Sequence, residues 1–267
     1  MNDTTAADFP RSRAIVPVLE ALPEAGSTND VLSARAGDLP DLSVVVTRSQ
    51  TGGRGRLGRV WVSPPGKALA ISVLLKPHGL APESLGWFPL LAGLAMSRAL
   101  GGLVEQEGGR RVAVKWPNDV HIDGLKVCGI LTELLPSSAG GIDGIVVGAG
   151  VNLTLDREEL PTGTSTSLAL SGATTTDPDT VLSAYLVELT TLYREFGAAG
   201  GDPDRSALRD QVTEACETIG RAVRVELPGG DVLLGTAAGL DRDGRLLVDA
   251  DAGRTAVAAG DVTHLRY

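Results

Sequence analysis

The stretch Val112-Ala-Val-Lys-Trp-Pro-Asn-Asp-Val-His-Ile-Asp-Gly124 contains two short apolar runs on either side of a polar segment, and a longer apolar run covers 126–135. Val112-Ala-Val114 and Val120-His-Ile122 are rich in β-branched residues and have the length of short strands. Asp123-Gly124 favours a tight hairpin turn, because both residue types accept a positive φ. This stretch therefore predicts a hairpin that turns into a further strand over 126–135.

Short apolar runs and longer amphipathic segments surround this hairpin on both sides. Runs without helical spacing predict strands, whereas apolar residues three or four positions apart predict helices that face a core. The expected strands cover 42–47, 68–75 and 142–153, and the expected helices cover 31–36, 85–100, 177–196 and 206–218. Strands and helices mixed in this way predict an α/β domain.

The sequence pattern changes after Gly220 to short stretches of alternating apolar and polar residues, typical of strands, separated by Gly and Asp turns. The expected strands cover 223–227, 231–236, 245–249 and 255–257. They predict a small β-barrel of roughly fifty residues. We therefore expect an N-terminal extension over 1–20, a large domain over 21–219 and a small domain over 220–267.

Composition limits the class of protein. The chain has 267 residues and a formal net charge of −9, which disfavours non-specific binding to nucleic acid. Its two cysteines, Cys128 and Cys216, lie far apart without a CxxC pattern, so neither a zinc site nor a disulfide framework is indicated. The N-terminus lacks the pattern of a signal peptide, and no apolar run reaches spanning length. We expect a soluble, cytoplasmic protein.

Positive charge is concentrated against this acidic background in one Gly-rich segment, Thr51-Gly-Gly-Arg-Gly-Arg-Leu-Gly-Arg59. Glycines let backbone N–H groups approach phosphate oxygens, and guanidinium groups bind such oxygens in pairs. A solvated loop or a segment that binds single-stranded nucleic acid has a similar composition. The segment is no Walker A loop, because no Gly-Lys-Ser/Thr follows. It predicts a phosphate or adenylate site.

Several motifs together resemble those of the bacterial biotin protein ligases in order and approximate spacing, over about residues 20–267. They are Ser27-Thr-Asn29, Gln50, Gly53-Arg-Gly-Arg-Leu-Gly-Arg59, Trp61, Lys115-Trp-Pro-Asn-Asp119, Lys126-Val-Cys-Gly-Ile-Leu-Thr-Glu133 and Gly148-Ala-Gly-Val-Asn152. The resemblance implies a mixed β-sheet flanked by helices, of the class II synthetase and biotin ligase type, with a C-terminal SH3-like barrel. It also implies a two-step reaction. Biotin and Mg-ATP form biotinyl-5′-AMP, and the biotinyl group then passes to a lysine of a biotin carboxyl carrier domain of acetyl-CoA or another acyl-CoA carboxylase.

The resemblance also assigns residues. Lys126, Arg54 and Arg56 are the implied catalytic residues. The implied biotin contacts are Ser27, Thr28, Asn29, Gln50, Arg54, Gly55, Arg56 and Lys126. The implied ATP or adenylate contacts are Arg54, Arg56, Arg59, Trp61, Lys115, Asn118, Asp119, Asn152 and Arg266. No metal is expected to be fixed by the protein alone, although Asp119 is a possible contact of the Mg²⁺ that accompanies ATP.

Each of these residues also has an ordinary structural interpretation. Ser27 or Asn29 can cap a helix, Lys126 can be a solvated lysine at a hairpin end, Trp61 can be a core anchor, and Arg266 can be a surface arginine at the chain end. Trp116 is expected to hold its loop in place. Cys128 stands where small residues are common in the family, and a buried inert thiol is expected there. His78, His121 and His264 fall in no motif.

Two other functions stay open at this point. A lipoate or octanoate transfer enzyme shares the fold but would need a hydrophobic tunnel, and it lacks this arginine-rich segment. A module that only senses biotin or a nucleotide would not need both Lys126 and the arginines. The expected partners are biotin, ATP and the carrier domain, with no nucleic acid and no membrane. The expected state is a monomer or weak homodimer, without the helix-turn-helix domain of repressor-type ligases.

Overall fold

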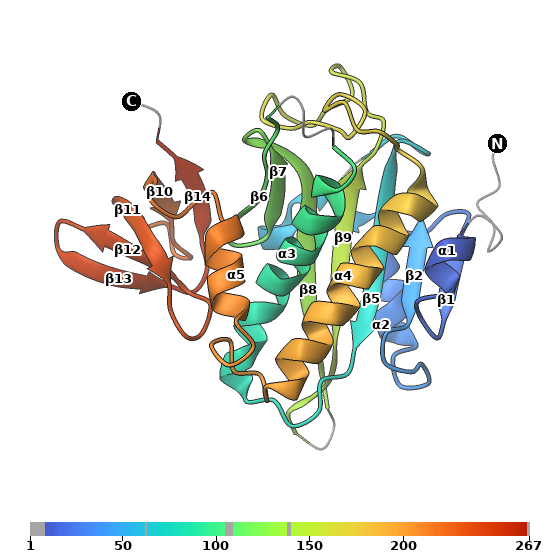
Figure 1. Ribbon diagram of the computed structural model, residues 1–267, viewed down its shortest axis with the longest axis horizontal. Coiled ribbons are helices and arrows are strands. Elements are labelled where there is room, and N and C mark those ends of the chain that lie inside the picture. Colours follow the sequence, from blue (N-terminus) through green and yellow to red (C-terminus); the bar gives the residue numbers. More distant parts are fainter. Residues whose placement is uncertain (1–8, 62, 105–108, 138–139, 266–267) are drawn as a thin grey trace.

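The computed structural model describes residues 9–61, 63–104, 109–137 and 140–265. Its centre is a seven-stranded sheet in the order β1-β2-β5-β9-β8-β7-β6, in which only β1 and β2 run parallel to each other (Figure 1). The strands are β1 (Leu19–Leu22), β2 (Val44–Thr47), β5 (Ala68–Leu75), β6 (Val112–Lys115), β7 (Asp119–Ile122), β8 (Leu125–Pro136) and β9 (Ile142–Asn152). The predicted mixed sheet is confirmed, with β6, β7 and β8 where the hairpin pattern placed them.

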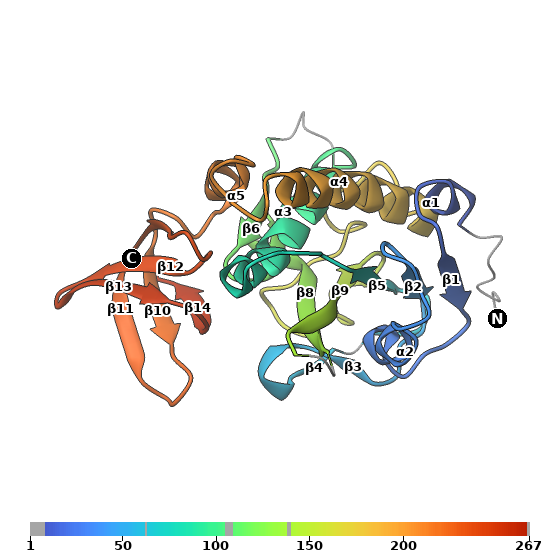
Figure 2. The same cartoon turned by 90° about the horizontal axis from the view of Figure 1, so that it is seen from below.

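Helices cover both faces of this sheet, which explains why all eight residues of β5 are buried. The helices α3 (Phe88–Gly101) and α4 (Pro178–Ala198) lie along one face, and α2 (Thr28–Ala34) lies on the other (Figure 2). The Asp177 carboxylate caps α4 by accepting a hydrogen bond from the backbone N–H of Thr180 at 2.9 Å. The helix α5 (Leu208–Ala215) packs against α3 and is shorter than the predicted 206–218.

The chain before the predicted main domain contributes structure that the sequence did not predict. The helix α1 (Pro10–Arg13) packs against α4, and its residues Arg11 and Ser12 donate backbone hydrogen bonds to the buried Asp179 carboxylate at 2.9 and 3.0 Å. The strand β1 then pairs with β2. Residues 9–22 are therefore packed onto the α/β body.

The arginine-rich segment forms a small hairpin on the same face as α2. Strands β3 (Gly53–Arg54) and β4 (Val60–Trp61) pair only with each other, and a 3₁₀ turn, η2 (Arg56–Gly58), joins them. Leu57 and Gly58 both have positive φ, 57° and 73°, which lets the tip reverse direction. We call residues 53–61 the arginine hairpin.

The C-terminal domain is a five-stranded antiparallel sheet in the order β13-β12-β11-β10-β14. Its strands are β10 (Ala222–Glu226), β11 (Val232–Leu240), β12 (Leu246–Ala250), β13 (Gly253–Val257) and β14 (Asp261–His264). Within the described residues, the edge strands β13 and β14 do not pair with each other, so the small β-barrel expected from the sequence is an open sheet and not a closed barrel. The prediction of an SH3-like small domain holds, with β14 as a strand that the sequence pattern missed.

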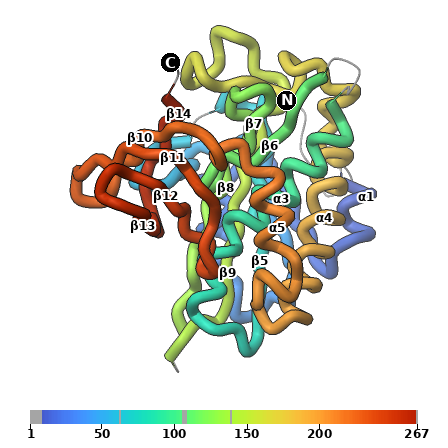
Figure 3. Tube along the Cα trace, turned by 60° about the vertical axis from the view of Figure 1, so that its left-hand side comes forward, coloured from blue at the N-terminus to red at the C-terminus, as the bar shows by residue number. Residues whose placement is uncertain are grey.

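Two buried indole rings of the α/β body hold the turn between β11 and β12. Trp87 donates its Nε1–H to the carbonyl of Arg242 at 2.8 Å, and Trp116 donates to the carbonyl of Gly244 at 3.1 Å. Gly86 allows the turn to come close, because a Cβ there would lie 2.5 Å from the carbonyl oxygen of Asp243. The C-terminal sheet therefore lies beside α5 in a fixed position against the body (Figure 3).

We predict that Trp87→Phe lowers the free energy of unfolding by about 1–3 kcal/mol, because it removes one hydrogen bond and leaves a small void in a fully buried position. Urea-induced unfolding followed by circular dichroism measures the change. An unchanged midpoint would show that the indole does not hold the two parts together.

Candidate active site

A cavity of about 870 Å³ lies over the strands β5, β8 and β9, between α2, the arginine hairpin and the C-terminal domain. Its walls contain all the described residues that the resemblance assigns to biotin or ATP. These are Ser27, Thr28, Asn29, Gln50, Arg54, Gly55, Arg56, Arg59, Trp61, Lys115, Asn118, Asp119, Lys126 and Asn152. Arg266 lies outside the described residues. Sequence positions up to 125 residues apart therefore meet around one space.

One end of the cavity is a network of hydroxyl, amide and carboxylate groups. Gln50 accepts hydrogen bonds at Oε1 from the backbone N–H and the Oγ1–H of Thr28, at 3.0 and 3.2 Å. Ser72 lies 2.8 Å from Thr28 Oγ1 and 2.6 Å from Asn29 Oδ1, and Asn29 donates its Nδ2–H to Glu133 at 2.6 Å. The network fixes the orientation of the Asn29 amide, so Oδ1 and Nδ2 can be assigned.

Ser27 serves as the N-cap of α2, where its Oγ accepts a hydrogen bond from the backbone N–H of Asp30 at 3.4 Å. The capping role considered from the sequence is therefore real for Ser27, which also lines the cavity. Ser72 and Glu133 support the neighbouring polar residues, although neither was assigned a role from the sequence.

Three glycines of β8 and β9 make room for two of the cavity side chains. A Cβ at position 148 would lie 2.5 Å from Asn29 Oδ1, and a Cβ at position 150 would lie 2.6 Å from Cε2 of Trp61. Gly129 pairs with Gly150 across the two strands and is also close to the Trp61 ring, at 3.0 Å from its hypothetical Cβ. The Trp61 ring therefore lies directly on the backbone of the sheet.

The three arginines of the hairpin have different partners. Arg54 forms two hydrogen bonds with the Asp30 carboxylate, at 2.6 and 2.5 Å, and lies 3.1 Å from Glu133 Oε1. These contacts raise the pKa of Arg54 and lower the pKa of Asp30, in each case mainly through their mutual hydrogen bonds. Arg59 forms an ion pair with Asp261 of the C-terminal domain. Both charges are thus compensated within the protein.

Arg56 and Lys115 are the cavity cations that burial affects most. Arg56 donates to Asn118 Oδ1 at 3.1 Å and approaches the carbonyl of Gly260 at 3.5 Å, and neither it nor Lys115 forms an ion pair with a described residue. Burial lowers the pKa of both groups, and the attraction of Asp119 does not offset it. An anion that enters the cavity would restore the solvation that these cations lack.

Lys126 lies between a carboxylate and an aromatic ring. Its Nζ is 2.6 Å from Asp119 Oδ1 and 5.6 Å from the centroid of the Trp61 ring. Lys126 is therefore a cation whose position is set before any ligand binds.

Two asparagines of the predicted site use their amide groups to hold the backbone. Asn118 donates to the carbonyl of Ile130 at 2.6 Å, which turns its Oδ1 toward Arg56. Asn152 is buried and donates to the carbonyl of Thr166 at 2.9 Å. The backbone N–H of Trp116 donates to Thr218 Oγ1 at 3.2 Å.

Two histidines without a predicted role also line the cavity. His121 Nδ1 lies 2.7 Å from Glu217 Oε1; burial acts to raise the pKa of Glu217, but contact with His121 outweighs it and the pKa is lowered. His264 Nε2 lies 3.2 Å from Thr218 Oγ1, and burial together with the charge of Lys115 lowers its pKa to about 4. These contacts join distant segments, so no local pattern could have revealed them.

Three further properties of the described residues concern thiol reactivity, metal binding and membrane insertion. Burial raises the pKa of Cys128, as expected for an inert thiol. Among the described residues, no three His, Cys, Asp or Glu side chains come together as a metal-binding group. In the same part of the chain, no helix has both the length and the apolar character needed to cross a membrane.

Comparison with known families identifies the class. Residues 23–152 match the Biotin/lipoate A/B protein ligase family, and residues 218–265 match the Biotin protein ligase C terminal domain. The second match covers the open sheet of β10 to β14. The fold and the cavity are therefore those of a ligase of this class.

Individual relatives narrow the class further. The chain is 35% identical to the biotin–acetyl-CoA-carboxylase ligase of Mycobacterium tuberculosis, over 93% of this chain and 89% of that protein. It is 31% identical to the bifunctional ligase/repressor BirA of Escherichia coli, over 90% of this chain and 70% of that protein. The biotin protein ligase of Aquifex aeolicus in complex with biotin and ATP superimposes with a TM-score of 0.74 at 28% identity, over 94% of this chain and all of that one. The chain belongs to the biotin protein ligase family.

We predict that Gly150→Ala displaces the Trp61 ring, because the new Cβ would overlap it. Trp87 and Trp116 are buried, whereas Trp61 is half-buried. The difference between the fluorescence spectra of the variant and the wild type should therefore come mainly from Trp61. Gly37→Ala is the matched control, since no atom lies within 4 Å of its hypothetical Cβ. Equal spectra for the two variants would contradict the placement of Trp61.

Proposed function

We propose that the protein activates biotin with ATP to biotinyl-5′-AMP and transfers the biotinyl group to a lysine of the biotin carboxyl carrier domain of an acyl-CoA carboxylase, such as acetyl-CoA carboxylase. The observation that carries the proposal is a single cavity with a fixed polar network at one end and desolvated cations beside it. The relatives named above support the same reaction.

The polar network suits the ureido ring of biotin, which has two N–H donors and one carbonyl acceptor. Thr28, Asn29 and Gln50 offer hydroxyl and amide groups of both kinds, and Ser72 and Glu133 hold them in place. A ligand that enters this end can therefore be oriented without large movement of the protein.

The first chemical step brings two anions together. A carboxylate oxygen of biotin attacks the α-phosphorus of ATP, and the bond to the bridging oxygen of pyrophosphate breaks. We assign charge stabilisation to Arg56 and Lys115, which form no ion pair with a described residue, and to Lys126, which lines the cavity beside its partner Asp119 and matches the lysine of the family motif. Asn118 and Asp119 supply oxygen atoms that suit the Mg²⁺ bound to the triphosphate.

The second step needs less catalytic assistance from the protein than the first step. The neutral amine of the carrier lysine attacks the carbonyl carbon of the mixed anhydride, the carbon–oxygen bond to AMP breaks, and the amine loses its proton. The anhydride is already activated, so correct placement of the amine supplies most of the rate. The arginine hairpin forms part of the cavity wall and must move to admit that amine.

A transfer of lipoate or octanoate is the alternative within the same broad family. A medium-length acyl chain needs an apolar channel, whereas Thr28, Asn29 and Gln50 place polar groups in the cavity wall. An acyl chain offers these hydroxyl and amide groups no hydrogen bond in place of the water that it displaces.

The deciding experiment incubates the purified protein with Mg-ATP, a purified carrier domain and either biotin, lipoate or octanoate. We expect pyrophosphate release and a mass increase of the carrier only with biotin. Modification of the carrier by octanoate or lipoate, and not by biotin, would reject the proposal in favour of the alternative.

We predict that Lys126→Ala folds normally and loses about two orders of magnitude in the rate of biotin-dependent pyrophosphate release, because a cation beside the meeting anions is gone. Lys76→Ala is the matched control, as Lys76 lies outside the cavity lining. Near wild-type release by Lys126→Ala would remove the catalytic role assigned to this lysine.

A further inference from the structure

We propose that Asp261, the first residue of β14, is a positioning residue that holds the arginine hairpin over the cavity. It would do so through its ion pair with Arg59, and the C-terminal domain would in this way control retention of the adenylate. This inference rests on the proposed function and adds to it a role for the small domain.

The hairpin has few contacts of its own that could keep it closed. Its two strands pair only with each other and join neither large sheet. Leu57 at its tip and Val60, which pairs with Arg54, are 69% and 73% exposed, so burial of apolar surface does not hold the tip. Trp61 packs the base of the hairpin on β8 and β9, so the position of the tip depends on polar contacts of the arginines.

Those contacts divide between the two domains. Arg54, at the base of the hairpin, is held by Asp30 of α2. Arg56 and Arg59, nearer the tip, reach two consecutive residues of the C-terminal domain, the carbonyl of Gly260 and the carboxylate of Asp261. The base is thus held by the α/β body, Arg56 contacts both Asn118 of the body and the small domain, and Arg59 has its carboxylate partner in the small domain.

Asp261 belongs to a rigid part of the small domain. Asp261 lies opposite Glu226 in the backbone pairing of β14 with β10. A Cβ at Gly260 would lie 2.8 Å from Val225 Cγ1, so the turn before β14 packs closely on β10. The side chain of Asp261 is 26% exposed, whereas that of its partner Arg59 is 67% exposed. The carboxylate is the fixed member of the pair, and the arginine with its hairpin is the member that can leave.

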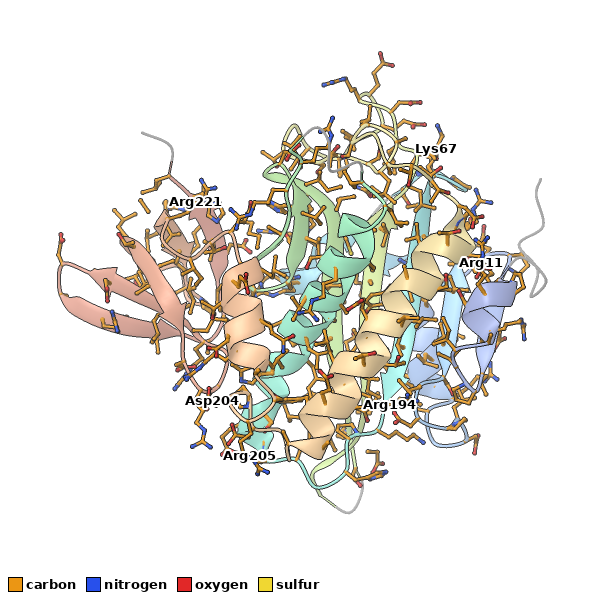
Figure 4. All side chains as sticks on the ribbon, in the orientation of Figure 1. Arg11, Lys67, Arg194, Asp204, Arg205 and Arg221 are labelled. Atoms are coloured by element: carbon orange, nitrogen blue, oxygen red, sulfur yellow. The ribbon has the colours of Figure 1, made fainter. Side chains whose placement is uncertain are left out.

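The small domain is in turn fixed to the body at its other end. The indole groups of Trp87 and Trp116 hold the turn between β11 and β12, whereas Asp261 begins β14 on the cavity side. Arg221 also lies in the cavity wall and is labelled in Figure 4. Asp261 therefore has a stable platform, so loss of its carboxylate should release the hairpin tip without loosening the domain.

The test uses the full chain with Asp261→Asn, which keeps the size of the side chain and removes its charge. Because exposed ion pairs shift an equilibrium by up to about fivefold, we expect preformed biotinyl-5′-AMP to dissociate about threefold to fivefold faster. We also expect the KM for ATP to rise by a similar factor, with the affinity for biotin alone unchanged. Asp251→Asn is the matched control, because it removes the same charge from an exposed turn of the same domain.

Coupling between the two residues gives a second readout. Arg59→Gln should speed dissociation by a similar factor, and the double variant should be no faster than the faster single variant. The exchanged pair, Arg59→Asp with Asp261→Arg, should restore slow dissociation in part. An unchanged rate in Asp261→Asn, equal effects in Asp251→Asn, or additive effects of the two single variants would each overturn the proposal.

A third readout does not depend on the proposed reaction. Trypsin cuts after arginine, so cleavage within 54–59 of the ligand-free protein should be faster in Asp261→Asn than in the wild type and in Asp251→Asn. Failure of the wild type to form biotinyl-5′-AMP would refute the proposed function but leave this readout usable. Equal cleavage rates in the three proteins would refute the anchor itself.

Discussion

The close approach of side chains to the backbone of β8 and β9 is the constraint on which the site depends. Asn29 and Trp61 occupy positions where a Cβ on Gly148 or Gly150 would lie within about 2.6 Å of them. The glycines weaken the strands locally, but hydrogen-bonded neighbours on both sides compensate for this. Because these positions carry no side chain, this surface of the sheet is flat, and α2 and the arginine hairpin can meet above it.

Charge compensation then decides which cations remain for a ligand. The protein is acidic overall, and its carboxylates hold three of the cavity cations, Arg54, Arg59 and Lys126. Arg56 and Lys115 instead lose solvation without gaining an ion pair among the described residues. An acidic surface with two such cations inside one cavity favours a small anion over a nucleic-acid backbone.

The sequence predicted elements with a long pattern, such as the strand that became β5 and the helix that became α4, and it predicted the short strands β6 and β7 because the Asp123-Gly124 turn and their β-branched residues mark them. It missed β1 and β14, because four residues such as Leu19-Glu-Ala-Leu22 carry too little periodicity and become strands only by pairing with distant partners. The expected barrel proved open for a similar reason, since closure depends on whether two edge strands meet. The resemblance led to the residues of the cavity wall, but the supporting contacts of Ser72, Glu133 and Asp261 connect positions that no spacing rule relates.

A hairpin that covers an adenylate must satisfy two opposing demands. It must exclude water while the mixed anhydride exists, and it must open when the carrier lysine arrives. Tight apolar packing of Leu57 and Val60 would favour the first demand at the expense of the second, and both side chains are instead exposed. Ion pairs at the surface are weak enough to break and directional enough to restore one closed position. The division of these pairs between α2 and the C-terminal domain lets the base of the hairpin stay fixed while its tip moves.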